Sequence, residues 1–147
     1  LHFGLLDLLA WGWNRAGFAV RPLMDAPWKA RTLGEFWGLR WNRGFSEVNR
    51  WAIYRPIAKV AGAPVALLAG FLFSGVIHDL VVSVPAGAGY GWPTAYFLAQ
   101  GGAVLAEKRW NLRGRCWVAA LVGGPVLFLF HPGFLTDVMA PHFELLP

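Results

Sequence analysis

An apolar run from Val60 to Val84 dominates the hydropathy pattern of the chain. It contains no Lys or Arg and is long enough to cross a bilayer as a helix. Two further apolar segments follow, at about 92–107 and about 116–135. The former is short for a straight span, and the latter is broken near its centre by Gly123-Gly124-Pro125. This pattern predicts an all-α, polytopic membrane protein with about three transmembrane helices.

An amphipathic pattern precedes these segments. Thr32, with Glu35 three residues later and aromatic residues next, forms a capping-box pattern that predicts a helix start. We expect this helix to run to about Tyr54, before Arg55-Pro56. At 100° per residue, its apolar positions share one broad arc and most of its polar positions lie opposite. The apolar arc holds Leu33, Phe36, Trp37, Trp41, Phe45, Val48, Trp51 and Ala52, and the other arc holds Glu35, Leu39, Asn42, Arg43, Ser46, Glu47 and Arg50. Such a helix is typical of one that lies in the membrane surface, here on the cytoplasmic side.

The first 31 residues give weaker signals. The apolar stretch from Phe3 to Trp13 is interrupted by Asp7 and predicts the end of a membrane helix or an interfacial helix. Residues 21–31 hold two prolines and three cations, which favours an irregular cytoplasmic loop. We interpret residues 1–147 as one domain, and the start with Leu in the middle of a pattern is typical of a piece of a longer chain. It would be the C-terminal part of a longer protein with a larger helical bundle.

Composition and charge place these helices in a membrane. The chain is 56% hydrophobic and only 14% charged, whereas a soluble domain carries about 25% charged residues. Nine of the 13 Lys and Arg lie between Arg15 and Lys59, and the other four lie between Lys108 and Arg115. This distribution is expected of cytoplasmic loops under the positive-inside rule and argues against a nucleic-acid partner. The first two spans would then form a hairpin with its 85–91 turn outside, in a multi-pass protein of the cell inner membrane.

His78 and Asp79 are ionisable residues inside the long apolar run. An Asp at the centre of a membrane helix costs roughly 2.5 to 3.5 kcal/mol, so such residues usually face a bundle interior and carry function. A neutral imidazole costs less and can take and return a proton near neutral pH. His78 lies about 21 Å along a helix that starts at Pro64, beyond the middle of the hydrocarbon core. Asp79 either orients His78 or lies at a lipid–water edge, because adjacent helical residues point about 100° apart.

A stripe of small residues leads to this pair. Gly62, Ala66, Gly70 and Ser74 precede His78 at intervals of four. The stripe predicts close packing against another helix or the wall of a tunnel, and the two interpretations are compatible.

Asn42 is a second candidate, near the centre of the polar arc and between Trp41 and Arg43. An amide offers both a donor and an acceptor, so it could hold a carbonyl group or another side chain. The pattern alone also allows an ordinary solvated Asn.

Other chemical motifs are missing from the sequence. The single cysteine, Cys116, excludes a disulfide framework and a cysteine-rich metal site. No HExxH, GxSxG or GxGxxG string occurs. His131-Pro132 lies at the end of the third segment, where we expect a structural His. We therefore predict no metal and no bound cofactor.

Two strings of the sequence resemble a known family. They are Glu35-Phe36-Trp37-Gly38-Leu39-Arg40-Trp41-Asn42-Arg43 and Ser74-Gly75-Val76-Ile77-His78-Asp79. In this order and at this spacing they are similar to the wax synthase-like branch of the membrane-bound O-acyltransferase superfamily. Asp79 and Leu39 stand where that branch usually has Glu and Arg.

The resemblance implies an acyl-CoA-dependent O-acyltransferase that acts on a lipophilic alcohol and makes wax or sterol esters. His78 would be its general base and Asn42 the second active-site residue, with Trp41, Arg43, Ser74 and Asp79 near the substrates. Acyl-CoA would be a co-substrate, and membrane lipids would surround the protein. Two alternatives stay open: transfer to a saccharide or lysolipid, and a transporter fragment in which His78 and Asp79 relay protons. Arg40, Arg43 and Arg50 would bind either CoA phosphates or anionic lipids.

Overall fold

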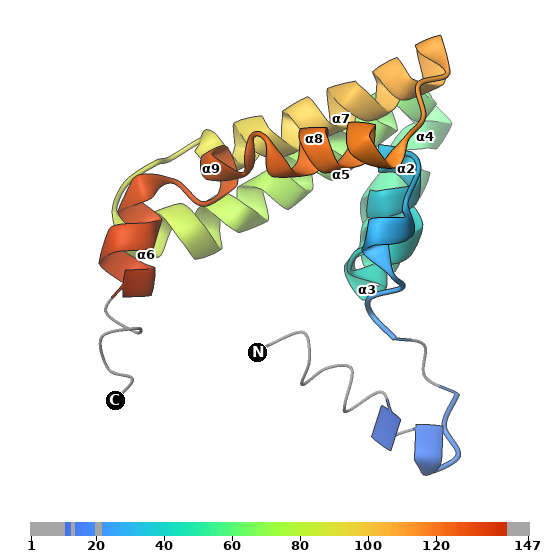
Figure 1. Ribbon diagram of the computed structural model, residues 1–147. Coiled ribbons are helices and arrows are strands. Elements are labelled where there is room, and N and C mark those ends of the chain that lie inside the picture. Colours follow the sequence, from blue (N-terminus) through green and yellow to red (C-terminus); the bar gives the residue numbers. More distant parts are fainter. Residues whose placement is uncertain (1–10, 13, 20–21, 141–147) are drawn as a thin grey trace.

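The computed structural model describes residues 11–12, 14–19 and 22–140, and throughout these residues the only regular structure is helical. The apolar stretch expected between Phe3 and Trp13 lies almost entirely outside them. The helices, with their π-helical and 3-10 parts (labelled η), are η1 Pro27–Lys29, α2 Leu33–Glu35, η2 Phe36–Arg40, α3 Arg43–Asn49, η3 Arg50–Tyr54, α4 Arg55–Ala61, α5 Ala63–His78, η4 Asp79–Ser83, α6 Val84–Ala86, α7 Trp92–Trp110, α8 Arg115–Gly123, α9 Val126–Leu129 and η5 Phe134–Met139. The prediction of an all-α chain is confirmed (Figure 1).

The predicted helix from Thr32 to Tyr54 is wrong in the middle. Its start is as expected, because the Thr32 hydroxyl accepts a hydrogen bond from the Glu35 backbone N–H at 3.0 Å. The helix then breaks at Trp41, which is extended, and Asn42, which is left-handed at φ 41°. Residues 22–25 satisfy the backbone groups that the break leaves open: Asp25 N–H donates to the Arg40 carbonyl and Arg43 N–H to that of Leu23. The long amphipathic arc is therefore split into two helices with separate packing.

The predicted stop before Arg55-Pro56 is also wrong, because the helix passes this point and ends at Ala61. Proline inside a helix removes one backbone donor and crowds the preceding turn. The π-helical turn η3 lies directly before this dipeptide, and the Arg55 N–H bonds to the Arg50 carbonyl, five residues back. Such wider turns interrupt the normal hydrogen-bond ladder. The chain reverses instead at Gly62, whose φ of 83° is accessible mainly to glycine.

The long apolar run forms one continuous helix, Ala63–Ala86, through α5, η4 and α6. It is 24 residues long and contains an 18-residue window with a mean hydropathy of 2.1, and within the described part of the chain only this helix is long and apolar enough to cross a membrane. Large apolar side chains such as Val65, Leu72, Val76 and Leu80 are exposed on it. Arg115–Leu129 is apolar but shorter. The predicted number of about three spans is therefore not confirmed.

α5 and α7 lie side by side in opposite directions (Figure 1). Glycines bring them close: a Cβ on Gly75 would come within 2.6 Å of the Thr94 Cα, and one on Gly101 within 3.0 Å of the Phe71 ring. The predicted turn between them is present, with left-handed Gly87, Gly89 and Gly91.

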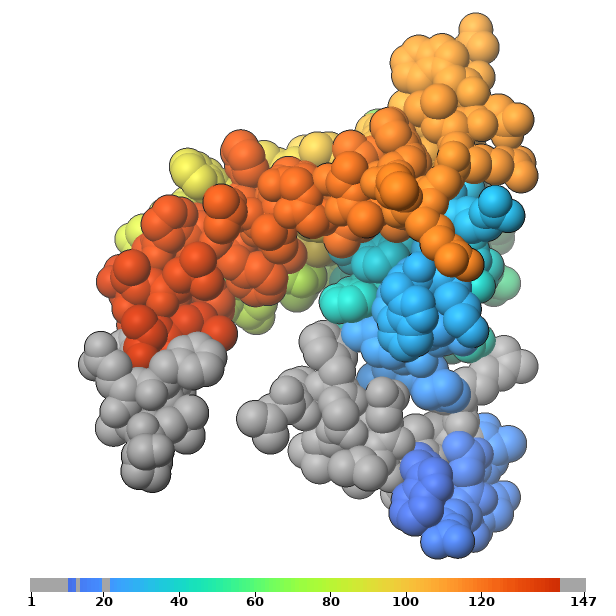
Figure 2. All heavy atoms as spheres, in the orientation of Figure 1, coloured from blue at the N-terminus to red at the C-terminus, as the bar shows by residue number. Residues whose placement is uncertain are grey.

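The predicted interruption of the third apolar segment is present. α8 ends at Gly123, and α9 starts at Val126. α8 and α9 pack along α7 and cover one face of the molecule, while α2 and α3 project from one end (Figure 2).

Glu107, at the end of α7, fixes the start of the motif-bearing helix. Its buried carboxylate accepts hydrogen bonds from the Leu33 N–H at 2.6 Å, the Gly34 N–H at 3.2 Å and the Trp117 indole at 2.8 Å. The first backbone donors of a helix have no partner within the helix, so an acid from elsewhere can cap them. Leu33 and Phe36 are buried in the same core cluster with Val104. This core places residues 33–49 beside α5 and α7.

Candidate active site

A cavity of about 1200 Å³ lies between the segment 34–55, α5, α7 and α9. Among the site residues expected from the sequence, Trp41, Asn42, Ser74 and His78 line it. These residues come from the two motif strings, so the break at Asn42 and the packing of α3 on α5 bring the strings together. Most of the remaining wall is apolar or aromatic. Concave, largely apolar cavities with a few polar groups are typical of ligand sites.

His78 is held in a defined orientation. Its Nδ1 lies 2.7 Å from the Ser74 carbonyl oxygen, one turn earlier in α5. A carbonyl only accepts, so the neutral ring carries its proton on Nδ1 and has its lone pair on Nε2. The ring of Phe97 from α7 packs against the imidazole with 4.4 Å between ring centroids. No described residue forms a hydrogen bond with Nε2, which leaves a basic nitrogen for a molecule in the cavity.

Asn42 has a structural function that was not expected from the sequence. It is the N-cap of α3, and its Oδ1 accepts a hydrogen bond from the Phe45 N–H at 3.3 Å. Asn tolerates the left-handed conformation better than most residues and is a preferred N-cap. The cap fixes the orientation of the amide, so Nδ2 is the group left for a ligand. Within the described chain, Nδ2 forms no hydrogen bond.

Three of the four residues in the small-residue stripe serve the functions considered for it, whereas Gly62 lies in the exposed turn between α4 and α5. Ala66, Gly70 and Ser74 are buried and line the cavity. Gly70 also contacts α3, because its carbonyl accepts a hydrogen bond from the Asn49 amide at 3.0 Å. The stripe therefore packs against a helix and forms part of the cavity wall.

Asp79 does not reach the cavity, and no hydrogen bond joins it to His78. Its carboxylate accepts hydrogen bonds from the Ser83 hydroxyl at 3.0 Å, the Gly91 N–H at 2.8 Å, and both the N–H and the hydroxyl of Thr94. Gly91 is the N-cap residue of α7. Asp79 thus ties the 87–91 turn and the start of α7 to the long apolar helix. Its predicted contact with substrate gains no support from this geometry.

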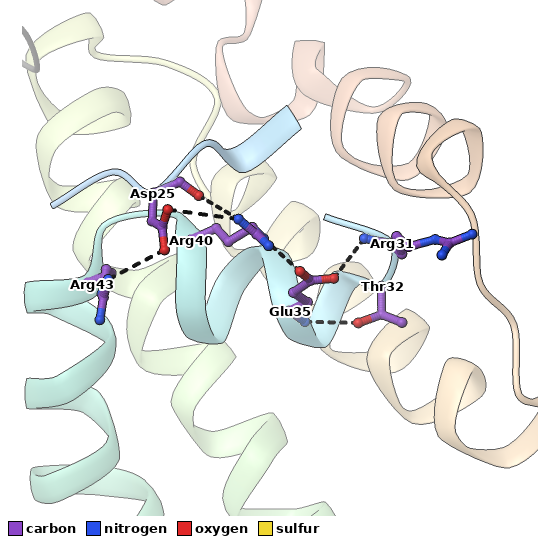
Figure 3. A network of polar contacts seen from close by, with 6 residues as sticks. All are labelled: Asp25, Arg31, Thr32, Glu35, Arg40 and Arg43. Carbon is purple, nitrogen blue, oxygen red and sulfur yellow. Dashed lines mark hydrogen bonds and ion pairs between the residues drawn. The ribbon is translucent and has the colours of Figure 1, made fainter. Parts of the chain in front are cut away.

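Arg43 also lies outside the cavity, in a polar network at the break (Figure 3). Asp25 lies 3.6 Å from the Arg43 guanidinium, and Arg40 donates to the Asp25 carbonyl at 2.9 Å and to Glu35 at 2.7 Å. A backbone hydrogen bond from Arg31, and then the Arg40 guanidinium, lower the pKa of Glu35 below its ordinary value of 4.5. Arg40 and Arg43 therefore stabilise the break and the 22–25 loop.

Three cavity residues, Asn49, Arg55 and Lys108, were not expected from the sequence, whereas Arg50 was already a candidate phosphate ligand. Arg50, Arg55 and Lys108 line the cavity together, although Lys108 is far from the others in sequence. Asn49 also lines it. Asn49 follows Asn42 by seven residues, a spacing that returns to the same helix face. That signal was available in the sequence, because the predicted helix over residues 32–54 also places Asn42 and Asn49 on one face.

Comparison with known proteins identifies the class of protein that carries this site. The model of the membrane bound O-acyl transferase family matches residues 20–99, which include both motif strings. The chain therefore belongs to this family of membrane-bound proteins.

Three similar proteins from plants carry names of one type. The chain is 32% identical over 113 residues to "Probable long-chain-alcohol O-fatty-acyltransferase 9" of Arabidopsis thaliana, covering 69% of the chain and 33% of that relative. It is 30% identical over 140 residues to the Arabidopsis protein numbered 2 in the same series, covering 82% and 41%. It is 28% identical over 100 residues to "Long-chain-alcohol O-fatty-acyltransferase" of Simmondsia chinensis, covering 62% and 28%. The alignments thus span less than half of each relative. No solved structure matches the chain significantly.

Proposed function

We propose that this chain carries the active site of an O-acyltransferase that moves an acyl group from acyl-CoA to the hydroxyl of a lipophilic alcohol, giving a wax or sterol ester. The observation that carries the proposal is the oriented His78, whose Nε2 is unpartnered among the described residues, in the same cavity as Asn42. Membership of the family and relatives named as long-chain-alcohol O-fatty-acyltransferases support the reaction type.

In the proposed reaction, His78 Nε2 removes the proton of the alcohol while the alcohol oxygen attacks the thioester carbonyl. The carbon–sulfur bond then breaks, the ester is released, and the imidazolium returns the proton to the CoA thiolate. Asn42 Nδ2 donates a hydrogen bond to the carbonyl oxygen as negative charge develops on it. The Ser74 carbonyl fixes the tautomer, and Phe97 fixes the plane of the imidazole ring.

The charges around the cavity support a CoA donor. Arg50 and Arg55 follow α3, and Lys108 lies near the end of α7, so three cations border a mostly apolar space. Phosphate groups favour such a cluster of Arg and Lys. Arg40 and Arg43 are held by carboxylates instead. We therefore assign the phosphates of CoA to Arg50, Arg55 and Lys108, in place of the set that includes Arg40 and Arg43.

We also propose that the protein crosses the membrane several times, with both basic regions on the cytoplasmic side. The long helix Ala63–Ala86 supports one crossing. α5 starts just after Lys59 and α7 ends just after Lys108, and because the two helices are antiparallel both basic regions lie at the same end of the pair (Figure 1). Location in the cell inner membrane stays a prediction from the charge pattern.

The test is ester formation by membranes that contain the whole protein. Labelled long-chain acyl-CoA is supplied with a panel of long-chain alcohols, sterols, lysolipids and saccharides, and membranes with His78→Ala give the background. We expect a lipophilic ester from alcohols or sterols that is missing in the variant. Product from a saccharide or lysolipid alone would change the acceptor class. Proton flux without any ester would overturn the proposal in favour of a transporter.

A further inference from the structure

Phe97 of α7 lies face-on against the ring of His78. The two ring centroids are 4.4 Å apart, and the ring planes are tilted by 40°, closer to parallel than to perpendicular. At so short a separation the imidazole overlies the face of the phenyl ring instead of its edge. Phe97 is buried and lines the cavity together with His78.

Neighbouring aromatic rings fix the orientation of Phe97. Trp37 packs on it with 5.5 Å between ring centroids, and Tyr96 meets it edge to face at 5.3 Å. The Trp37 indole donates a hydrogen bond to Oε1 of the buried Gln100 at 3.2 Å. The face of Phe97 therefore turns away from His78 only if the whole cluster rearranges.

The proposed reaction makes His78 a cation for part of each turnover. Nε2 takes the proton of the alcohol as the new carbon–oxygen bond forms, and returns it to the thiolate once the carbon–sulfur bond breaks. Between these two steps the imidazolium lies in a cavity whose wall is mostly apolar. A charge that is removed from water is costly unless other groups compensate for it.

An aromatic face can supply part of this compensation. The Ser74 carbonyl already accepts a hydrogen bond from Nδ1. Asp79 is the next residue in sequence, but in the described chain no ion pair joins it to His78, and its carboxylate bonds to the 87–91 turn and the start of α7. The face of an aromatic ring carries partial negative charge and attracts a cation within about 6 Å of its centroid. Phe97 meets this distance condition.

His131 has aromatic neighbours in a different arrangement. It is buried, and its Nδ1 accepts a hydrogen bond from the Phe134 N–H at 3.3 Å. The rings of Trp92 and Phe134 meet it at steep angles, with centroids 6.4 and 6.5 Å away. Both separations exceed the cation–π range of about 6 Å. The close, face-on contact is thus found at His78, the histidine that becomes charged in the proposed reaction.

We propose that Phe97 is a positioning residue that stabilises the imidazolium form of His78 by a cation–π interaction and thereby speeds acyl transfer. This inference rests on the proposed function, because it requires His78 to act as a general base. It goes beyond holding the plane of the imidazole, which another apolar side chain of similar size could also do. It predicts that the rate depends on the electron density of the ring face when the size of the ring is constant.

The first test changes this electron density at nearly constant size. The whole protein is made with phenylalanine, 4-fluoro-, 3,5-difluoro- or 3,4,5-trifluorophenylalanine at position 97. Single-turnover rates are then measured in nanodiscs with saturating acyl-CoA and alcohol. Each fluorine withdraws electrons from the ring face and weakens its attraction for a cation. We expect the rate to fall stepwise, by about 3- to 30-fold over the series.

Phe73 provides the matched control. It is a ring of α5 that stacks on Phe45 and is not part of the cavity wall. The same fluorinated series at Phe73 should leave the single-turnover rate unchanged.

The second test uses Phe97→Leu and the Michaelis constants. Leucine keeps an apolar side chain beside His78 but has no aromatic face, so the rate should fall at least as far as with the trifluorinated ring. Across the fluorinated series the KM for acyl-CoA and the KM for the alcohol should stay at wild-type values, because the interaction strengthens only when the imidazole is charged. The thermal midpoint should also stay constant.

The outcomes separate this inference from the proposed function. A constant rate across the series, with ester still formed, would overturn the inference alone. A loss of rate that follows a fall in the thermal midpoint, or that appears equally at Phe73, would show a packing function and contradict the inference. A rise in KM at constant rate would place Phe97 against a substrate and also contradict it. Wild-type protein that forms no more ester than His78→Ala would overturn both.

Discussion

His78 and Asp79 are neighbours in one apolar helix, yet they belong to two regions that use polar groups differently. At Asp79 both carboxylate oxygens accept hydrogen bonds, and the donors come from Ser83, Gly91 and Thr94. In the cavity region, His78 uses Nδ1 to fix the ring and keeps Nε2 without a partner in the described chain.

This difference shows how a polar residue that acts on a ligand can be told from one that stabilises the fold in a membrane helix. His78 and Asp79 are both polar residues in an apolar helix, and their desolvation cost alone does not tell their functions apart. The hydrogen bonds distinguish these two residues: the Asp79 carboxylate is saturated by groups of the fold, whereas His78 keeps Nε2 without a partner in the described chain.

His78→Ala should abolish chemistry and leave the fold intact. A general base contributes about 10²- to 10⁴-fold to rate, so we expect ester formation to fall by at least this range. The side chain makes one internal hydrogen bond, to its own helix, so the thermal midpoint in detergent should stay close to that of the wild type. If His78→Ala lost activity only because it unfolded, His78 would be a structural residue like Asp79.

Asn42 caps α3 with its Oδ1 and also offers its Nδ2 to a ligand in the cavity. The variant Asn42→Asp separates these two functions. Aspartate keeps an oxygen for the Phe45 N–H and tolerates the left-handed backbone, so the cap and the stability should be retained. The variant loses the Nδ2 donor. If that donor acts on the thioester oxygen, kcat should fall about 10²- to 10³-fold. Wild-type turnover by Asn42→Asp would reduce Asn42 to a cap.

Asp79→Ala should lower the stability of the protein and leave the chemistry of the folded protein unchanged, the reverse of His78→Ala. It leaves the donors of Gly91 and Thr94 without their acceptor, which costs about 1 to 3 kcal/mol of stability. Thermal unfolding should therefore shift to lower temperature, while the protein that remains folded keeps its KM for acyl-CoA. Asp79→Asn retains one acceptor and should be intermediate. A selective rise in KM at full stability would instead return Asp79 to the substrate site.

The smallest effect concerns Glu35 in the network at the break. Its pKa is lowered in the folded state, so its stabilising contribution is present above the ordinary value of 4.5 and is lost as the pH falls through the lower, folded value. The thermal midpoint of the wild type should therefore fall more steeply below about pH 4.5 than that of Glu35→Gln. At neutral pH the variant should be slightly less stable. Equal slopes would show that Glu35 contributes nothing to acid sensitivity.

Several local features were predictable because neighbouring residues decide them. The Thr32 cap, the glycine-rich turn at 87–91 and the interruption near Pro125 all follow from short-range backbone preferences. The periodic arc over residues 33–54 led to the wrong prediction of one continuous helix. Helical periodicity does not reveal a break whose backbone groups form hydrogen bonds with another segment. Asp25 and Leu23 supply those partners from a loop.

The all-helical class, the long apolar helix and the choice of His78 and Asn42 as the residues of interest could be read from the sequence. Apolar periodicity, chain length and two short strings were sufficient for these conclusions. Only the tertiary structure decided that Asn42 caps a helix, that Asp79 is a tie to α7, and that Asn49 and Lys108 reach the cavity. These outcomes depend on which distant donor or acceptor satisfies each polar atom. Such partners are selected by packing between helices, which hydropathy along one chain does not record.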